Sequence, residues 1–195
     1  MDNFLVGVLS SIVAGLLVAI FRAARNGWSL RRMRGVWLQV IDERPRRYSL
    51  GTLYFDLWKA KYRYDGTAYE HDGSKRAYWN TVGAFFDKDH SQFLYIYEGS
   101  DAGSGATKGH GFGLIRVPTA TQGYAQTDGY FIGAETAAPE QRNARFYRAK
   151  EVAIKEKILF DPRDDDSRKN LIEKLAAQNW PDRPVVVPPS VPPRS

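Results

Sequence analysis

The chain has 195 residues, no cysteine, and 28 basic against 22 acidic residues, for a net charge of +6. The lack of cysteine excludes a disulfide scaffold and a cysteine-ligated metal. The excess charge is local, because eight arginines between residues 22 and 47 meet only two acidic residues there and the rest is balanced. A polynucleotide-binding protein more commonly spreads basic residues over a folded face, so we expect no nucleic acid polymer as a partner.

The first element is the uncharged apolar run from Phe4 to Phe21. As a helix it would be about 27 Å long, close to the hydrocarbon thickness of a bilayer. A cleaved signal peptide is the alternative, but its basic segment would precede a shorter apolar core, whereas these arginines follow the run. The positive-inside rule therefore predicts a single-pass signal anchor (1–25) in the inner membrane, a basic juxtamembrane linker (26–33) and a cytoplasmic C-terminal bulk.

Small residues recur at every fourth position of the apolar run, at Gly7, Ser11, Gly15 and Ala19. On a helix they would share one face, where small side chains let two membrane helices approach closely. The same residue types are also frequent in membrane helices in general. The stripe therefore indicates either a homo-oligomeric helix contact or ordinary membrane-helix composition.

Beyond the anchor, short β-type runs alternate with turn residues. We expect eight strands, near residues 34–41, 48–56, 61–69, 77–86, 92–98, 109–117, 124–133 and 144–148. Asp65-Gly66 and Asp128-Gly129 are typical of reversals or of bulges within longer strands. Sequential antiparallel strands over 34–150 predict a sandwich or an up-and-down barrel. Runs that are apolar on both faces, such as 93–97, favour a barrel whose outside is partly covered, for which the following helical segment is a candidate.

The segment 151–180 has a charged, helical pattern. We expect a helix over 149–158, a break at Asp161-Pro162, and a second helix, capped by Asp166-Ser167, that runs to Gln178. The Pro-rich tail (181–195) is expected to be an extended, solvated terminus or, alternatively, a PxxP ligand. The fold class is therefore mainly β, with an N-terminal transmembrane helix, an eight-stranded antiparallel up-and-down barrel, C-terminal helices and this tail.

The sequence contains no recognisable catalytic motif. The three histidines are isolated from one another, and the glycine-rich stretch 99–113 lacks the Gly-Lys-Ser/Thr order of a phosphate-binding loop. We expect this stretch to form a hairpin loop at the barrel mouth, and we expect no enzyme activity, metal or cofactor. A hydrolase assembled from scattered residues such as Asp56, Asp65 and His110 is an alternative that no spacing supports.

Aromatic and basic side chains on the predicted strands suit a planar, anionic ligand, because bases stack on Tyr and Trp and arginine pairs with phosphate. Each aromatic residue would also serve as core, and each arginine as solvated surface. The candidate ligand-binding residues are Tyr78, Trp79, Asn80, Tyr95, Tyr97, Arg116, Arg145, Tyr147 and Arg148.

Six short sequences carry a resemblance to a known family. They are Gly35-Val36-Trp37, Gly66-Thr67-Ala68-Tyr69, Tyr78-Trp79-Asn80-Thr81, Tyr95-Ile96-Tyr97, Gly129-Tyr130-Phe131 and Phe146-Tyr147-Arg148. Together with the N-terminal run, the layout of residues 4 to 150 resembles the membrane-anchored β-barrel effectors of the CBASS anti-phage systems. The resemblance implies a lipocalin-like barrel that senses a cyclic nucleotide made by a CD-NTase. That family typically has two N-terminal membrane helices, whereas this sequence has one apolar run.

The expected function is that of a receptor-effector. A cyclic di- or oligonucleotide bound at the barrel would drive self-association, and the membrane helices would disrupt the inner membrane and cause abortive infection. In a related hypothesis the nucleotide has the opposite effect and holds the effector inactive. The alternative is a membrane-anchored lipocalin-like binder of an apolar ligand, which would show a wholly apolar cavity rather than one with arginines.

Overall fold

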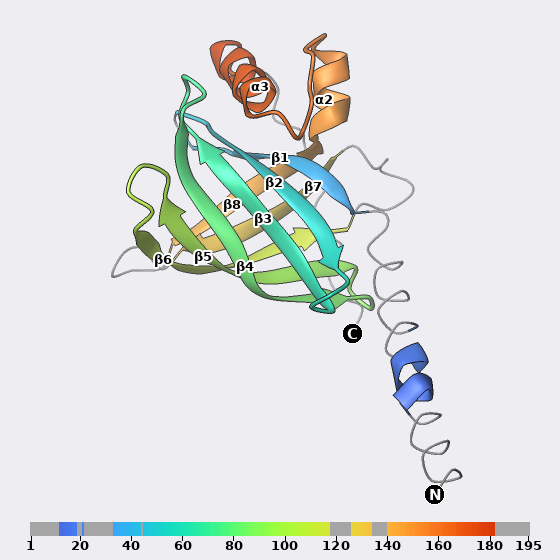
Figure 1. Ribbon diagram of the computed structural model, residues 1–195. Helices are drawn as coiled ribbons and strands as arrows, with labels where there is room; N and C mark the ends of the chain where they lie inside the picture. Colours follow the sequence, from blue (N-terminus) through green and yellow to red (C-terminus); the bar gives the residue numbers. More distant parts are fainter. Residues whose placement is uncertain are drawn as a thin grey trace, which may run out of the picture.

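The computed structural model describes residues 12–18, 21, 33–43, 45–117, 126–133 and 140–181 (Figure 1). From residue 33 onward this part forms eight strands and two helices, and the eight expected strands are all present. The strands are β1 (Gly35–Ile41), β2 (Arg47–Asp56), β3 (Lys61–Tyr69), β4 (Lys75–Asp87), β5 (Gln92–Asp101), β6 (Thr107–Arg116), β7 (Gln126–Gly133) and β8 (Glu140–Arg148). The helices are α2 (Ala149–Lys155) and α3 (Asp165–Ala177).

The sheet closes into a barrel. Each strand pairs antiparallel with the next, and β8 returns to pair with β1, with Trp37 opposite Arg148. The up-and-down barrel is therefore confirmed over the sandwich. We call the end where β1 leads to β2, β3 to β4 and β5 to β6 the mouth. The opposite end, where β1 begins and the β2–β3 and β4–β5 turns lie, is the base.

Two Asp-Gly pairs lie inside regular strands. Asp65-Gly66 pairs in unbroken register with β2, and Asp128-Gly129 does so with β8, so neither pair is a reversal or a bulge there. The register shifts occur elsewhere, between Ala68 and Tyr69, between Thr81 and Gly83, and between Gly99 and Ser100. The Gly66 position is explained by the close approach of the Trp79 ring, which lies where a Cβ would stand.

Alternation along the strands creates two cores. The inward side chains fill the barrel around Trp37, Tyr64, Phe93 and Phe146. The outward side chains of β1, β2 and β8 pack against α2 and α3 through residues such as Leu38, Leu50, Tyr147, Val152, Leu171, Ile172 and Leu175. The helices thus cover one side of the barrel, as Figure 1 shows.

The expected helical cover is confirmed, but it does not lie over the strand that suggested it. The helices contact β1, β2 and β8, whereas Ile96, which points outward from β5, stays 50% exposed. The reason is connectivity, because α2 continues directly from β8 and β8 neighbours β1.

Both expected helices are present, with shifted ends. α2 stops at Lys155 rather than Ile158, and Lys157 adopts a left-handed φ of 55° that ends the helical path. α3 is capped by Asp164 instead of Asp166-Ser167, because the Asp164 carboxylate accepts the backbone N–H groups of those two residues.

Residues 12–18 are helical. Among the described residues, none of the helices combines the length and the apolar character needed to cross a bilayer. Gly15 of the small-residue stripe belongs to the described helix. Gly7, Ser11 and Ala19 lie outside the described residues, as do residues 26–32 of the predicted linker and residues 182–195 of the tail.

Candidate ligand-binding site at the barrel mouth

A cavity of about 110 Å³ opens at the mouth of the barrel. Its lining combines aromatic, polar and basic side chains, namely Tyr78, Trp79, Tyr95, Tyr97 and Phe131, then Gln39 and Ser49, then Arg47, Arg76, Lys108 and Arg142. The base is filled instead, because Trp37 is fully buried there, donates from its indole N–H to the Met33 carbonyl at 2.7 Å, and lies 4.2 Å from the Arg148 guanidinium. The cavity is therefore a cup that is open at one end.

The tyrosine walls of the cup depend on glycines in the facing strand. Tyr95 is the cross-strand partner of Gly113, and Tyr97 is the partner of Gly111. A Cβ at Gly113 would stand 2.2 Å from the Tyr95 ring, and one at Gly111 would stand 2.3 Å from the Tyr97 ring. Glycine therefore lets each ring lie across the neighbouring strand, and the sequence carries this signal as Tyr-x-Tyr facing Gly-x-Gly.

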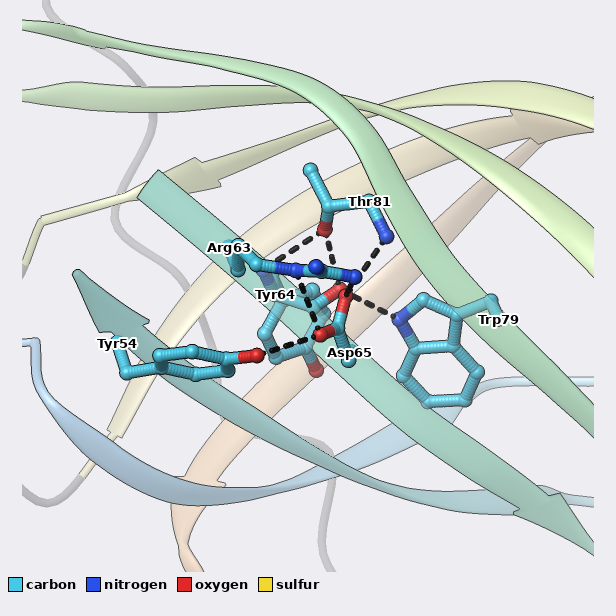
Figure 2. A network of polar contacts seen from close by, with 6 residues as sticks. All are labelled: Tyr54, Arg63, Tyr64, Asp65, Trp79 and Thr81. Carbon is cyan, nitrogen blue, oxygen red and sulfur yellow. Dashed lines mark hydrogen bonds and ion pairs between the residues drawn. The ribbon is translucent and has the colours of Figure 1, made fainter. Parts of the chain in front are cut away.

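Trp79 is held in place by a polar network that joins β3 to β4 (Figure 2). Its indole N–H donates to the Tyr64 carbonyl at 3.0 Å, and the Thr81 hydroxyl donates to the same oxygen at 2.7 Å. That hydroxyl also accepts the Tyr64 N–H at 2.7 Å. A threonine side chain thus satisfies both backbone groups of Tyr64, and the Trp79 ring is fixed against the inner wall.

The Asp65 carboxylate anchors the outer part of this network. It accepts the Thr81 N–H at 2.7 Å and the Tyr54 hydroxyl at 2.9 Å, and it pairs with the Arg63 Nε at 2.9 Å. Burial raises the pKa of Tyr54, and the hydrogen bond to Asp65 adds to this effect, so the phenol stays a neutral donor. These contacts assign Asp65 a structural role.

The three residues of the hydrolase alternative do not meet. Asp56 lies at the base, where it accepts the N–H groups of Trp58 and Lys59. His110 lies near the mouth end of β6, opposite Glu98 of β5 in the ladder. Asp65 is engaged in the network between them. In the part of the chain that the structure describes, no cluster of three His, Asp or Glu side chains could hold a metal ion.

Polar groups lie deep in the cup. Gln39 is 5% exposed and Ser49 is 3% exposed, and both line the cavity. Burial raises the pKa of Tyr95 well above its ordinary value, and the neighbouring Tyr64 and Tyr97 raise it further. The Tyr95 phenol therefore stays neutral at physiological pH. An amide and hydroxyls are the groups that can hydrogen-bond a heterocycle edge.

The rim of the cup carries four cations, each in an ion pair. Glu43 pairs with Arg47 at 3.0 Å and with Arg142 at 3.2 Å. Arg76 pairs with Glu70 at 3.6 Å, and Lys108 pairs with Asp101 at 2.7 Å. Four cations thus face three carboxylates. All four side chains are about a third exposed, and ion pairs with this much solvent contact stabilise a fold by about 0–1 kcal/mol.

The structure brings four of the nine predicted ligand-binding residues into the cavity lining, namely Tyr78, Trp79, Tyr95 and Tyr97. The other five do not line it. Asn80 is exposed, Arg116 pairs with Asp128, the buried Arg145 pairs with the exposed Asp42, Tyr147 packs edge-on against Trp180, and Arg148 lies over Trp37 at the base. Strand alternation explains part of this, because Arg145 and Tyr147 flank the inward Phe146 and therefore point outward.

Sequence reasoning missed Gln39, Ser49 and the four rim cations. Their shared property is topological, because they lie at the end of β1 or at the starts of β2, β4, β6 and β8, where an up-and-down barrel gathers them at one mouth. A residue-by-residue search for aromatic and basic side chains does not see this grouping. Placing each candidate along its predicted strand would have found it.

The fold belongs to the class of closed antiparallel up-and-down barrels. No protein-family model, curated protein or solved structure matches the chain.

Proposed function

We propose that this chain is a membrane-anchored receptor-effector of anti-phage defence, similar to the CBASS barrel effectors, which binds a cyclic di- or oligonucleotide from a CD-NTase at its barrel mouth. The observation that carries the proposal is the cup itself. Aromatic walls, buried amide and hydroxyl groups, and four rim cations converge on one cavity. This combination suits the base and the phosphates of a nucleotide.

The size of the cup limits what enters it. Its volume of about 110 Å³ compares with about 300–1,000 Å³ for a pocket that encloses a drug-sized ligand. One base would therefore enter, with its face on Trp79 or Tyr97 and its edge toward Gln39. The sugar-phosphate ring would remain at the rim, within reach of the arginines.

The rim cations are available to a phosphate despite their ion pairs. Glu43 serves both Arg47 and Arg142, so each arginine has a shared partner at an exposed site. Exposed pairs are weak, whereas a phosphate offers arginine two parallel charge-assisted hydrogen bonds. A nucleotide would replace these intramolecular pairs without a large loss.

The membrane part of the proposal draws on the sequence of residues 4–34. An apolar run followed by arginines suits a single-pass anchor with the barrel in the cytoplasm. The chain enters the barrel at the base, where β1 begins, and the cup opens at the other end. In this arrangement, the mouth faces a soluble messenger. Ligand-driven self-association would then bring the Gly7, Ser11, Gly15 and Ala19 faces together and perturb the bilayer.

The apolar-ligand binder is less well supported. An apolar molecule would desolvate Gln39 and Ser49 without giving them hydrogen bonds, which is unfavourable, and it would gain nothing from the four rim cations.

The test is calorimetry of the full chain in nanodiscs with a panel of cyclic di- and trinucleotides, together with sedimentation of the same samples. We expect saturable binding and a larger species. The double variant Arg76→Gln/Arg142→Gln should lose about 10- to 100-fold in affinity, as expected when hydrogen bonds to charged groups are removed. Co-expression with the matching cyclic-nucleotide synthase should arrest growth.

The matched control is Arg116→Gln. It also breaks an exposed arginine–carboxylate pair, with Asp128, but it lies outside the cavity lining. We expect it to bind as the parent does. Absence of binding across the panel, or an equal loss of affinity in the control, would contradict the proposal.

A further inference from the structure

The β2–β3 turn at the base displays two large apolar side chains to solvent. Trp58 is 100% exposed and Leu57 is 65% exposed. Tryptophan is usually among the most buried side chains on average. A fully exposed tryptophan beside an exposed leucine therefore requires an explanation outside the core.

The turn that carries these side chains is closed by hydrogen bonds to Asp56. The Asp56 carboxylate accepts the N–H groups of Trp58 and Lys59, each at 3.1 Å. Ala60 takes a left-handed φ of 48°, which closes the turn before β3 begins. The backbone of the turn thus directs Trp58 away from the barrel.

The tip is amphipathic, because lysines lie beside the two apolar side chains. Lys59 on the turn and Lys61 at the start of β3 follow Trp58, and both are exposed and make no ion pair among the described residues. Lys88 is exposed on the neighbouring β4–β5 turn, beside Asp87 and Asp89. The Asp87 carboxylate there is occupied by backbone N–H groups and by the His90 ring.

The turn also lies at a specific end of the barrel. Gly35, the first residue of β1, pairs with Leu53 near the end of β2, which places the start of β1 beside the turn. The residues directly before β1 are the arginine-rich stretch and the apolar run. The exposed tryptophan and the candidate anchor therefore share the base, opposite the mouth.

We propose that the β2–β3 turn is a membrane-contact site that seats the base of the barrel on a bilayer with anionic headgroups. Trp58 and Leu57 lie at the boundary of headgroups and acyl chains, where tryptophan is enriched. Lys59 and Lys61 lie among lipid phosphates, with their stems along the apolar surface. This inference rests on the proposed anchoring and adds to it a fixed orientation, with the base toward the lipid and the cup away from it.

The experiment reconstitutes the full chain in vesicles of phosphatidylcholine and phosphatidylglycerol, with and without brominated acyl chains, which quench nearby tryptophan emission. The emission lost in Trp58→Phe defines the Trp58 component among the five tryptophans. We expect brominated lipid to reduce this component by about half or more, as for an interfacial tryptophan. Because Trp58 is fully exposed, the substitution should leave the fold intact.

The matched control is Trp180→Phe. The Trp180 carbonyl accepts the hydroxyl of Tyr48, which lies at the mouth end of β2, so the Trp180 component should be quenched little. Lys59→Gln/Lys61→Gln should weaken quenching of Trp58 in anionic vesicles and leave it unchanged in purely zwitterionic ones.

The outcomes separate the two proposals. If the chain floats with vesicles but the Trp58 component is quenched no more than the Trp180 component, the membrane-contact site is wrong and the anchor stands. If the chain does not float with vesicles, both the anchor and the contact site are wrong.

Discussion

Among single residues, Asp101 most clearly connects side-chain contacts with the pH dependence of folding stability. Its carboxylate binds Lys108 at 2.7 Å and accepts the N–H groups of Gly103 and Ser104 at 2.9 Å. The Lys108 hydrogen bond, followed by those two backbone donors, lowers the pKa of Asp101 from its ordinary value of 3.8. Because the folded-state pKa is below the unfolded one, ionised Asp101 stabilises the fold above the ordinary pKa, and this stabilisation is lost as the pH falls below it.

The prediction for Asp101 concerns urea unfolding at acidic pH. Between about pH 5 and pH 3, the unfolding midpoint of Asp101→Asn should fall less than that of the parent, because the variant has no such carboxylate to protonate. Asp89→Asn is the control, since the Asp89 side chain makes no hydrogen bond among the described residues. If Asp101→Asn and Asp89→Asn show the same pH dependence, the hairpin contacts of Asp101 contribute nothing to stability.

At the scale of elements, the Thr81 side chain extends the junction of β3 and β4 beyond their ladder pairs. The paired register of these strands begins at Gly66 and Trp79, and beyond it the Thr81 hydroxyl serves the N–H and the carbonyl of Tyr64. Thr81→Val should lower the free energy of unfolding by about 1–3 kcal/mol, because it leaves the buried Tyr64 N–H unpaired and removes one of the two donors to the Tyr64 carbonyl, which keeps the Trp79 indole N–H. It should also speed hydrogen exchange at the Tyr64 amide.

Urea denaturation and amide exchange measure both effects of Thr81→Val. Thr52→Val on β2 is a matched control, since Thr52 is partly exposed and its side chain makes no hydrogen bond among the described residues. Equal stability of the two variants would show that the Thr81 hydroxyl contributes nothing to the junction.

The strands also show how much of the fold and of the candidate site can be predicted from the sequence. Turn chemistry and alternation placed both ends of β3 correctly, because they are local signals. The prediction of a reversal or bulge at Asp65-Gly66 is wrong, because glycine is needed at position 66 to make room for the Trp79 ring of the neighbouring strand. Local sequence patterns cannot show this contact. The site was predicted only in part for a similar reason. Tyr95 and Tyr97 stand out locally, whereas Arg47 and Arg142 join them only through closure of the barrel.

For the whole molecule, the helices are part of one folded unit with the barrel. Leu171 of α3 is fully buried in the core that includes Leu38 and Leu50. Leu171→Ala should lower the free energy of unfolding by about 2–5 kcal/mol, as large-to-small core substitutions do. Ile154→Ala on α2 is the control, because Ile154 is 68% exposed. Far-UV circular dichroism and barrel tryptophan fluorescence should report one shared transition in urea, and two separate transitions would mean that α3 docks independently.

Closure of the sheet has a further consequence for crowding. Every described strand pairs with a neighbour on both sides, so the ring has no edge strand with a wholly unpaired side that could template another chain. Folded copies brought close together by the proposed anchor would therefore offer one another no free strand for cross-β pairing. Any assembly of barrels must be encoded by their side chains, which makes assembly and folding separable by mutation.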